Sequence, residues 1–338
     1  MEFTASGPWE VRITPLDVGK RVSVRRLAEG GEADAKFTDT VGVLISWDDG
    51  VLVITRRTGE TVRILESSLV AGKVIPSVPA RRRGLPAASF EELARISARA
   101  WQPVESEPLG GWLLRAASGF TRRANSVLPL GDPGVPLDDA LERVRAWYGS
   151  RDLPAYIQTA TGGDGTQEAL CVELERRGWE REVSAELRVG GLAPVGDLDA
   201  DVSRVRLDRS IDDTGGAGEG WLRRYHRLGV PGPHVRSVLS SGPSVWFATV
   251  PGESEVPAAI GRCVVDGRWA GFMAVEVDPA RHRQGLAKSV MTALARRALD
   301  EGASAAWLQV ESDNDGARAM YEGMGFAVHH LYHHFRRS

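Results

Sequence analysis

Residues 275–288 read VEVDPARHRQGLAK, the stretch on which the fold prediction depends. The pattern predicts a buried strand, a turn at the proline and a helix that begins at Gly285. Backbone N–H groups of such a turn and of the first helical turn have no partners within the helix, and the helix dipole adds partial positive charge there. Gly285 would let this backbone approach an anion closely, and Arg283 and Lys288 add full charges. The stretch therefore fits a pyrophosphate cradle, but no better than it fits an ordinary strand–turn–helix corner.

A second motif lies further along the chain, where residues 314–326 read NDGARAMYEGMGF. Asn314 is a favourable N-cap, and Gly325 occupies the place of a helix-terminating glycine. The apolar residues of the segment recur at intervals of three and four and so share one helical face; they are Ala317, Met320, Tyr321 and Met324. Taken alone, this pattern allows Tyr321 to be a core aromatic at least as readily as a functional phenol.

Together, the two stretches resemble the acetyl-CoA-binding half of the GNAT family of N-acetyltransferases. That family has a strand ending in V-x-P, then R/Q-x-x-G-x-G/A, and later N-x-x-A-x-x-x-Y-x-x-x-G-F. The matching positions are Val277, Pro279, Gly285, Ala287, Asn314, Ala317, Tyr321, Gly325 and Phe326. His282 departs from the pattern, because Arg or Gln is usual there, and this affects one side-chain contact and not the backbone cradle.

The resemblance implies that acetyl-CoA is the cosubstrate and that the matched residues bind it. Backbone groups of Val275 and Val277 would pair with the pantetheine arm, and Asn314 would bond to the same arm. Tyr321 would protonate the leaving thiolate, since a phenol with a pKa of about 10 is protonated at neutral pH. The loop that would hold the pyrophosphate consists of His282, Arg283, Gln284, Gly285, Leu286, Ala287 and Lys288.

The general base is left open between two carboxylates. Many relatives have a Glu in the strand before the second motif, but the corresponding residue here is Gln309, which cannot take a proton. Glu311, two residues on, and Glu276, beside the cofactor strand, are the candidates. Either of them is also consistent with a solvated or structural carboxylate.

The chain as a whole resembles actinobacterial-type acetyltransferases with an SH3-like domain before a tandem GNAT-like region. Residues 156–189 repeat the strand–helix–strand pattern of 306–335, which supports a duplicated fold. We therefore expect an α+β protein with a mixed-sheet GNAT fold that occurs twice in tandem. The expected divisions are an SH3-like β-barrel at 1–80, a linker at 81–87, a degenerate GNAT-like half at 88–195 and the acetyl-CoA-binding GNAT domain at 196–338.

The first GNAT-like half lacks the R-x-x-G-x-G/A signature and is expected to bind no CoA. Its stretch GWLLRAASGFTRRANS, residues 111–126, is rich in polar and aromatic side chains that would line an acceptor pocket; the candidates are Trp112, Arg115, Arg123 and Asn125. The alternative is a sheet whose polar side chains bond within it. The tail HHLYHHFRRS is expected to be a final strand, with His330 or Tyr332 near the acceptor and no metal bound.

The composition of the chain argues against nucleic-acid and membrane-binding functions. The formal net charge is -3, which gives no overall attraction to nucleic acid or to an anionic membrane. The 338 residues include only two cysteines and no long apolar run, so we expect a cytoplasmic protein. Its oligomeric state is left open between a monomer and a homodimer. The expected function is direct acetyl transfer from acetyl-CoA to the amine of a small molecule or protein. The alternatives are a non-catalytic acyl-CoA sensor and a docking protein led by the SH3-like domain.

Overall fold

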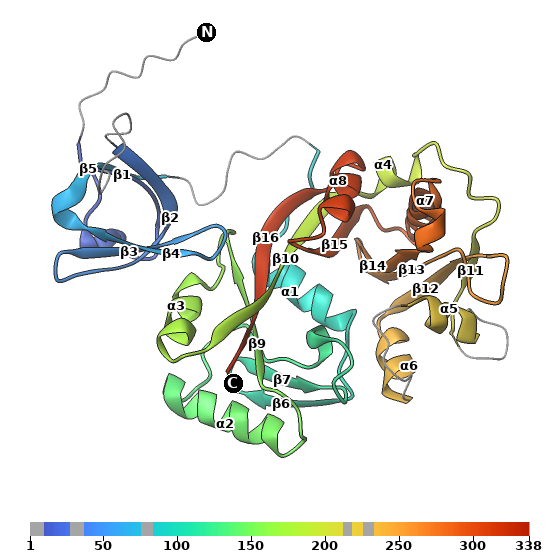
Figure 1. Cartoon of the computed structure of the whole chain (residues 1–338), viewed down its shortest axis with the longest axis horizontal. Coiled ribbons are helices and arrows are strands. Elements are labelled where there is room, and N and C mark those ends of the chain that lie inside the picture. Colours follow the sequence, from blue (N-terminus) through green and yellow to red (C-terminus); the bar gives the residue numbers. More distant parts are fainter. Residues whose placement is uncertain (1–9, 28–36, 76–83, 212–217, 226–232, 338) are drawn as a thin grey trace, which may run out of the picture. The chain divides into compact units, whose positions relative to one another are not determined.

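The computed structural model describes residues 10–27, 37–75, 84–211, 218–225 and 233–337, which fall in two compact units (Figure 1). The first unit comprises residues 1–81 and 160–178, and the second comprises residues 82–159 and 179–338. No helix in the described part of the chain is long and apolar enough to cross a membrane. The expected linker, residues 81–87, lies partly outside the described residues.

The first unit contains a small antiparallel sheet with the strand order β4-β3-β2-β1-β5. Its strands are β1 (Arg21–Leu27), β2 (Phe37–Asp48), β3 (Val51–Arg56), β4 (Thr61–Leu65) and β5 (Leu69–Val74). Alternating apolar residues turn inward to one core, formed by Ile13, Val22, Val24, Leu44, Leu52, Ile54 and Ile64. Asp49 and Gly50 both have positive φ, as a tight hairpin turn between β2 and β3 requires. The predicted small β-domain is confirmed.

This sheet is open, so the expectation of a closed barrel was wrong in that respect. Closure would require β4 and β5 to pair, and in the described residues they are the two edges. The chain passes from one edge to the other through the 3-10 turn η2 (Glu66–Ser68). A bridge from Val11 to Gly72 covers part of the β5 edge. The unit also contains η1 (Pro15–Asp17) and α3 (Glu168–Arg176), and α3 contacts β2.

The second unit is built on a mixed eight-stranded sheet with the order β11-β12-β13-β14-β15-β10-β16-β9. Its strands are β9 (Tyr156–Thr161), β10 (Glu180–Gly191), β11 (Arg206–Asp208), β12 (Ser244–Val250), β13 (Ala259–Asp266), β14 (Trp269–Val277), β15 (Ala305–Glu311) and β16 (Ala327–Arg336). A smaller sheet has β6 (Glu105–Leu109), β7 (Trp112–Ala116) and β8 (Leu128–Pro129). The helices are α1 (Phe90–Arg99), α2 (Leu137–Gly149), α4 (Leu192–Gly196), α5 (Gly218–Arg224), α6 (Pro233–Leu239), α7 (Leu286–Asp300) and α8 (Asp315–Gly323), and the short turns are η3 (Arg122–Ala124) and η4 (Pro279–Arg281).

The two sequence repeats are interleaved in this sheet. The strand that ends the first repeat, β10, pairs with β15 of the second, and β16, which ends the second, lies between β10 and β9. Figure 1 shows β10 and β16 side by side. Near Val127 and Ile157 the first repeat has a parallel bridge that corresponds to the parallel pairing of β14 with β15. The boundary expected at 195/196 therefore separates two sequence repeats that share one sheet.

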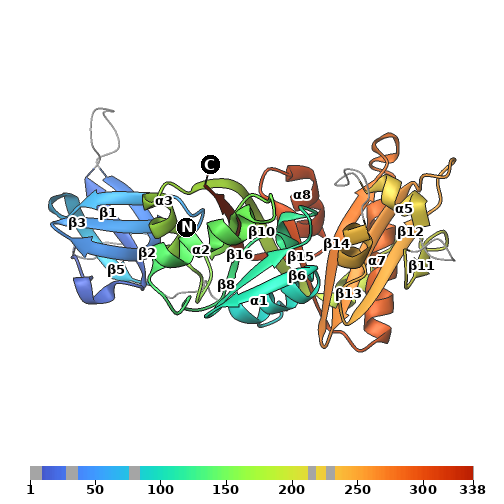
Figure 2. The same ribbon diagram turned by 90° about the horizontal axis from the view of Figure 1, so that it is seen from below.

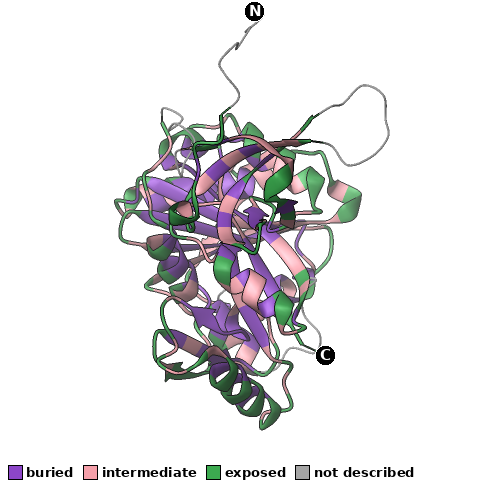
Figure 3. Cartoon of the chain, turned by 90° about the vertical axis from the view of Figure 1, so that its left-hand side faces the viewer, coloured by how far each residue is buried: buried purple, intermediate pink, exposed green. Residues whose placement is uncertain are grey.

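Helices cover both faces of the large sheet. Helix α7 contacts β12, β13 and β14, as Figure 2 shows, and its apolar residues pack in one core with Phe272, Leu308 and Val310. Tyr321 of α8 joins the same core, so α8 lies on this face, which we call the helix face. We call the opposite side the far face. There Phe90 of α1 contacts His330 at 5.2 Å between ring centroids. The buried residues, purple in Figure 3, run through the strands between these layers.

Candidate functional site

Strands β14 and β15 separate at the point where the resemblance places the cofactor arm. They pair in parallel only from Trp269 to Phe272 on β14. Beyond this point β14 continues beside β13, with Val277 opposite Ala259, whereas β15 continues beside β10. In the described structure the side of β14 that faced β15 therefore has no strand partner from Met273 onward. Exposed backbone N–H and C=O groups of this kind are a template for an added strand or an extended ligand.

A bulge fixes the backbone just after the separation. The register between β13 and β14 shifts between Ile260 and Arg262, and Ala274 has φ 51°, in the left-handed region. Gly261 accommodates the bulge, since a Cβ there would lie 2.4 Å from Cγ1 of Val290 on α7. The bulge re-aims the following residues, Val275 and Val277, which are half-buried on the helix face.

Ala274→Gly is expected to stabilise the protein by about 0.5–1 kcal/mol, because glycine adopts positive φ without the clash that Cβ causes. The measurement is urea unfolding, with the midpoint compared to the unmodified chain. Ala270→Gly is the matched control: this residue is fully buried in the same strand, so its change should destabilise the protein. A lower midpoint for Ala274→Gly would contradict the assignment of strain to this position.

The turn before α7 presents uncapped backbone N–H groups. Gly285 is the N-cap of α7 in a left-handed conformation, φ 80°, and no side chain caps the helix. Arg283 also has positive φ, 61°, so the chain alternates through conformations that direct successive N–H groups to one side. Apart from Gly285 itself and its two chain neighbours, no described atom lies within 4 Å of a Cβ built on Gly285, so the space beside it is open. Such a helix N-terminus suits an anion.

Two side chains of this turn make hydrogen bonds within the turn or to the strand before it. The His282 Nε2 atom lies 3.2 Å from the Val277 carbonyl oxygen, which ties the turn to the end of β14. The Arg281 Nε atom donates to Gln284 Oε1 at 2.8 Å. Arg283 is exposed, and Leu286, Ala287 and Lys288 are half-buried.

The second motif begins α8. The Asn314 Oδ1 atom accepts a hydrogen bond from the Ala317 N–H at 3.1 Å, so this residue caps the helix as expected. Tyr321 is only 8% exposed, and its ring meets Phe326 edge-on at 6.1 Å. A tyrosine has an apolar ring and a polar hydroxyl at its tip. The ring of Tyr321 can therefore pack in the core while its hydroxyl takes part in a reaction.

The two candidate bases lie on the far face at the same end of the sheet. Glu311 follows Val310 of the helix face by one residue, and Glu276 follows Val275 in the same way, so alternation turns both to the far side. Both are half-buried. Gln309 shares this face, and its Oε1 atom is buried with no hydrogen-bond partner among the described residues.

Three of the four acceptor candidates are bonded to other residues of the first repeat. Trp112 Nε1 donates to the Gly131 carbonyl at 2.9 Å. Arg115 donates to the Ser126 carbonyl and hydroxyl and to Gln158. Asn125 accepts from the Ala117 and Gly119 N–H groups and donates to the Phe120 and Thr121 carbonyls, and so holds the loop.

Arg123 alone of the four reaches the far face of the large sheet. Its Nε and Nη2 atoms donate to the Tyr332 hydroxyl at 3.0 and 2.5 Å. Sequence reasoning missed Trp101, whose ring lies near the Arg123 guanidinium, and Arg262, which contacts the same ring. The only signal for Arg262 was a charged residue inside an apolar strand, and no motif marks Trp101.

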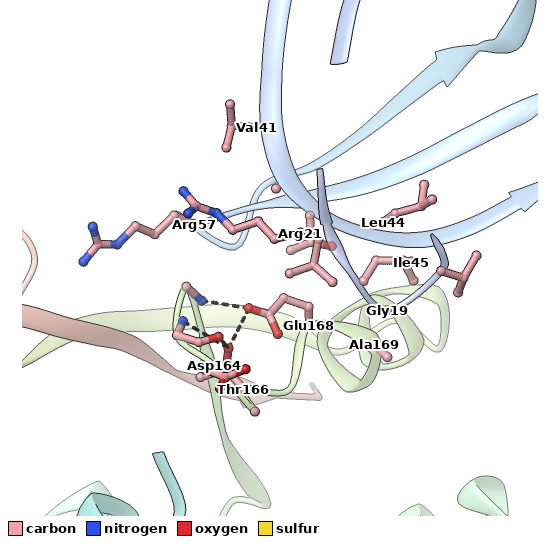
Figure 4. Close-up of a pocket in the computed structure, with 17 residues that line it drawn as sticks. Gly19, Arg21, Val41, Leu44, Ile45, Arg57, Asp164, Thr166, Glu168 and Ala169 are labelled. Carbon is pink, nitrogen blue, oxygen red and sulfur yellow. Dashed lines mark hydrogen bonds between the residues drawn. The ribbon is translucent and has the colours of Figure 1, made fainter. Parts of the chain in front are cut away.

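A cavity of about 440 Å³ lies in the first unit, lined by strand residues of the small sheet and by the loop 162–166 (Figure 4). Glu168 closes one side, and its Oε1 accepts from the Gly162 N–H at 2.8 Å and from Thr166 Oγ1 at 2.7 Å. Burial raises the pKa of this carboxyl. None of the cofactor-motif residues lines this cavity.

Two sequence families match the chain. The family described as "Probable histone acetyltransferase Rv0428c C-terminal" matches residues 88–335, and "Rv0428c N-terminal Sm-like domain" matches residues 16–73. "Probable histone acetyltransferase Rv0428c" from Mycobacterium tuberculosis is 28% identical over 317 residues, with 93% of each chain covered. "Uncharacterized N-acetyltransferase YobR" from Bacillus subtilis is 24% identical over 73% of this chain and 98% of its own length.

Solved structures have the same fold at low identity. A GCN5-related N-acetyltransferase from Kribbella flavida has a TM-score of 0.53 and 17% identity, covering 74% of this chain and 96% of its own. A tandem GNAT protein from the clavulanic acid biosynthesis pathway has a TM-score of 0.51 and 12% identity, covering 75% and 89%. The expected mixed α+β GNAT fold is thereby confirmed, and the Sm-like match agrees with the small open sheet.

Proposed function

This chain belongs to the Rv0428c-like acetyltransferase family, with an N-terminal Sm-like domain and a C-terminal acetyltransferase region, and from that premise we propose that it transfers the acetyl group of acetyl-CoA to an amine. The observation that carries the proposal is the separation of β14 from β15 beside an uncapped helix N-terminus. The pantetheine arm would lie along β14 at Val275–Val277. The pyrophosphate would lie at the 282–288 turn, with Asn314 toward the arm.

One cofactor site per chain is proposed, because the first repeat lacks the corresponding groups. When Gly178 and Trp179 are aligned with Gly325 and Phe326, Leu174 stands in the place of Tyr321. The helix of the first repeat that corresponds to α7, α2, has Pro136 as its N-cap, and proline has no N–H to offer an anion. We expect the first repeat to contribute to the acceptor side instead.

In the proposed reaction the two faces of the sheet have different roles. The amine nitrogen would approach from the far face and attack the thioester carbonyl carbon, forming the amide bond as the C–S bond breaks. Glu311 or Glu276 would take the proton that the amine loses. Tyr321, on the helix face, would give a proton to the thiolate. Alignment of amine and thioester alone supplies up to about 7–11 kcal/mol in the best cases.

We propose that the protein is cytoplasmic. Both cysteines, Cys171 and Cys263, are buried and free, as in a reducing compartment. Burial raises the pKa of the Cys263 thiol, which makes it a poor nucleophile and argues against an acyl-enzyme on that residue. The transfer is therefore proposed to be direct.

Acetyl-CoA is expected to bind with one site per chain in calorimetry and to release free thiol when an amine acceptor is supplied. Thiol release is followed with a chromogenic disulfide, and the acetylated amine is identified by mass. Two binding sites per chain, or no binding, would contradict the proposal. Binding without thiol release across small amines and lysine peptides would favour the sensor alternative, in which Gln309 replaces the missing Glu.

A further inference from the structure

A cationic and aromatic cluster spans the far face beside the separation of β14 and β15. We define the far-face cluster as Trp101, Arg123, Arg262 and Tyr332. The Arg123 guanidinium lies 5.9 Å from the Trp101 ring and 5.7 Å from the Tyr332 ring. The Arg262 guanidinium is 5.0 Å from the same Trp101 ring. The indole thus contacts two arginines.

The cluster reaches the strands that separate. Arg262 Nη1 lies 2.8 Å from the Met273 sulfur, at the position where β14 leaves β15. At the other end, Tyr332 of β16 is opposite Ala185 of β10, which is opposite Glu311 of β15. Residues opposite one another share a face, so Tyr332 and Glu311 are on the same side, two strand spacings or about 10 Å apart. The cluster therefore extends along the far face from the point where β14 leaves β15.

Neither arginine of the far-face cluster, Arg123 or Arg262, has a carboxylate partner among the described residues. Arg262 is fully buried and donates only to the Leu239, Ala100 and Ser241 carbonyls besides the Met273 sulfur. Arg123 donates only to the Tyr332 hydroxyl. Burial lowers the pKa of Arg262 to about 9. The half-buried Arg123 therefore offers an incoming anion a positive charge that no carboxylate of the described residues neutralises, and Arg262 adds its charge from the interior.

Buried polar atoms beside Arg123 also lack partners. Trp101 is 3% exposed, and its Nε1 donor has no hydrogen-bond partner among the described residues. His334 is also 3% exposed, both of its ring nitrogens are likewise unbonded, and its ring lies 5.7 Å from that of Tyr332. The arginines 115, 122 and 123 act on His334, and burial together with their charge holds its pKa well below the usual value. Neutral His334 and Trp101 thus each keep a hydrogen-bond donor for an incoming group.

Both signs of charge occur on this face. Glu276 and Glu311 lie beside the separation of β14 and β15, which we call the carboxylate end, and Arg123 is bonded to Tyr332, two strands from Glu311. We propose, resting on the acetyl-transfer function above, that the acceptor is a small amine that also carries an oxyanion, a carboxylate or a phosphate. The oxyanion binds Arg123 with the Trp101 N–H, and the amine reaches the carboxylate end. A lysine-rich segment matches only the carboxylate end and meets repulsion from the arginines.

The test compares acceptors that differ only in the anionic group. Straight-chain ω-amino carboxylates of two to eight carbons are measured against their carboxamides, O-phosphoethanolamine is measured against ethanolamine, and a lysine-rich peptide is included. Thiol release at saturating acetyl-CoA should give a kcat/KM at least about tenfold higher for the anionic member of the preferred pair, since charge-assisted hydrogen bonds are lost with the neutral one. Comparison of the amino carboxylates with O-phosphoethanolamine identifies which oxyanion the site prefers.

Arg123→Gln should remove this preference by raising KM for the anionic acceptor, with little change for the neutral one. Arg123→Lys, which keeps the charge, should restore part of it. Arg145→Gln is the matched control, because Arg145 is an exposed arginine on α2 and its loss changes net charge equally. Arg145→Gln should leave the preference intact.

If none of these amines is acetylated, the same compounds are tested as ligands of the CoA-saturated protein by thermal shift. Anionic members should raise the melting temperature in the unmodified chain and not in Arg123→Gln. Equal effects of anionic and neutral members, or faster acetylation of the lysine-rich peptide, would overturn the inference. Failure of acetyl-CoA itself to bind would instead overturn the proposed function.

Discussion

Gly285→Trp is expected to weaken acetyl-CoA binding by about 100-fold, equivalent to about 2.7 kcal/mol. The reason is steric. The space around a Cβ at this position is open in the described structure, and it is the space that the pyrophosphate would occupy against the N–H groups of α7. The measurement is the dissociation constant of acetyl-CoA by titration calorimetry.

Backbone strain must be separated from this steric effect. Gly285 has φ 80°, so any larger residue adds about 1–2 kcal/mol of conformational cost. Gly302, just past the other end of α7, has φ 90° and equally open surroundings. Gly302→Trp should therefore lower stability in a similar way and leave acetyl-CoA affinity unchanged. A Gly285→Trp protein that binds acetyl-CoA within threefold of the unmodified chain would exclude the cradle.

The local parts of the site were predictable because short segments encode them. The turn that ends at Gly285 needs a positive φ, and only a few residue types take one readily, so the glycine marks its conformation in the sequence. Asn314 as a helix cap is encoded in the same local way, and the structure has that cap. The roles of Tyr321, Glu311 and Glu276 stay predictions.

The long-range parts could not be predicted in this way. The strands β10 and β16 each follow a helix in the same repeated pattern. Nothing in the local sequence decides that β10, and not β16, pairs with β15. The contact of Arg262 with the Ala100 carbonyl joins residues 162 positions apart, which no spacing rule reveals. Alternation likewise identified the strands of the first unit but not whether its two edge strands meet.

Tyr321→Phe is expected to lower kcat by roughly 10²–10⁴, the range for a lost general acid. The change keeps the ring, so the edge-on contact with Phe326 and the burial on the helix face should persist. The dissociation constant of acetyl-CoA should hardly change, since the proposed phosphate and pantetheine contacts come from other residues. The measurements are thiol release with a verified acceptor and calorimetric titration.

Tyr148→Phe provides the matched control for loss of a buried hydroxyl. The Tyr148 hydroxyl donates to the Arg115 carbonyl at 2.8 Å and accepts from the Arg115 N–H at 3.2 Å, away from every cofactor motif. Its removal leaves those backbone groups unsatisfied and should reduce stability by about 1–3 kcal/mol without changing kcat. Tyr321→Phe should show the reverse, a large fall in kcat with a modest change in stability. If instead kcat is unchanged for Tyr321→Phe, Tyr321 is a core residue only, and another group or water protonates the thiolate.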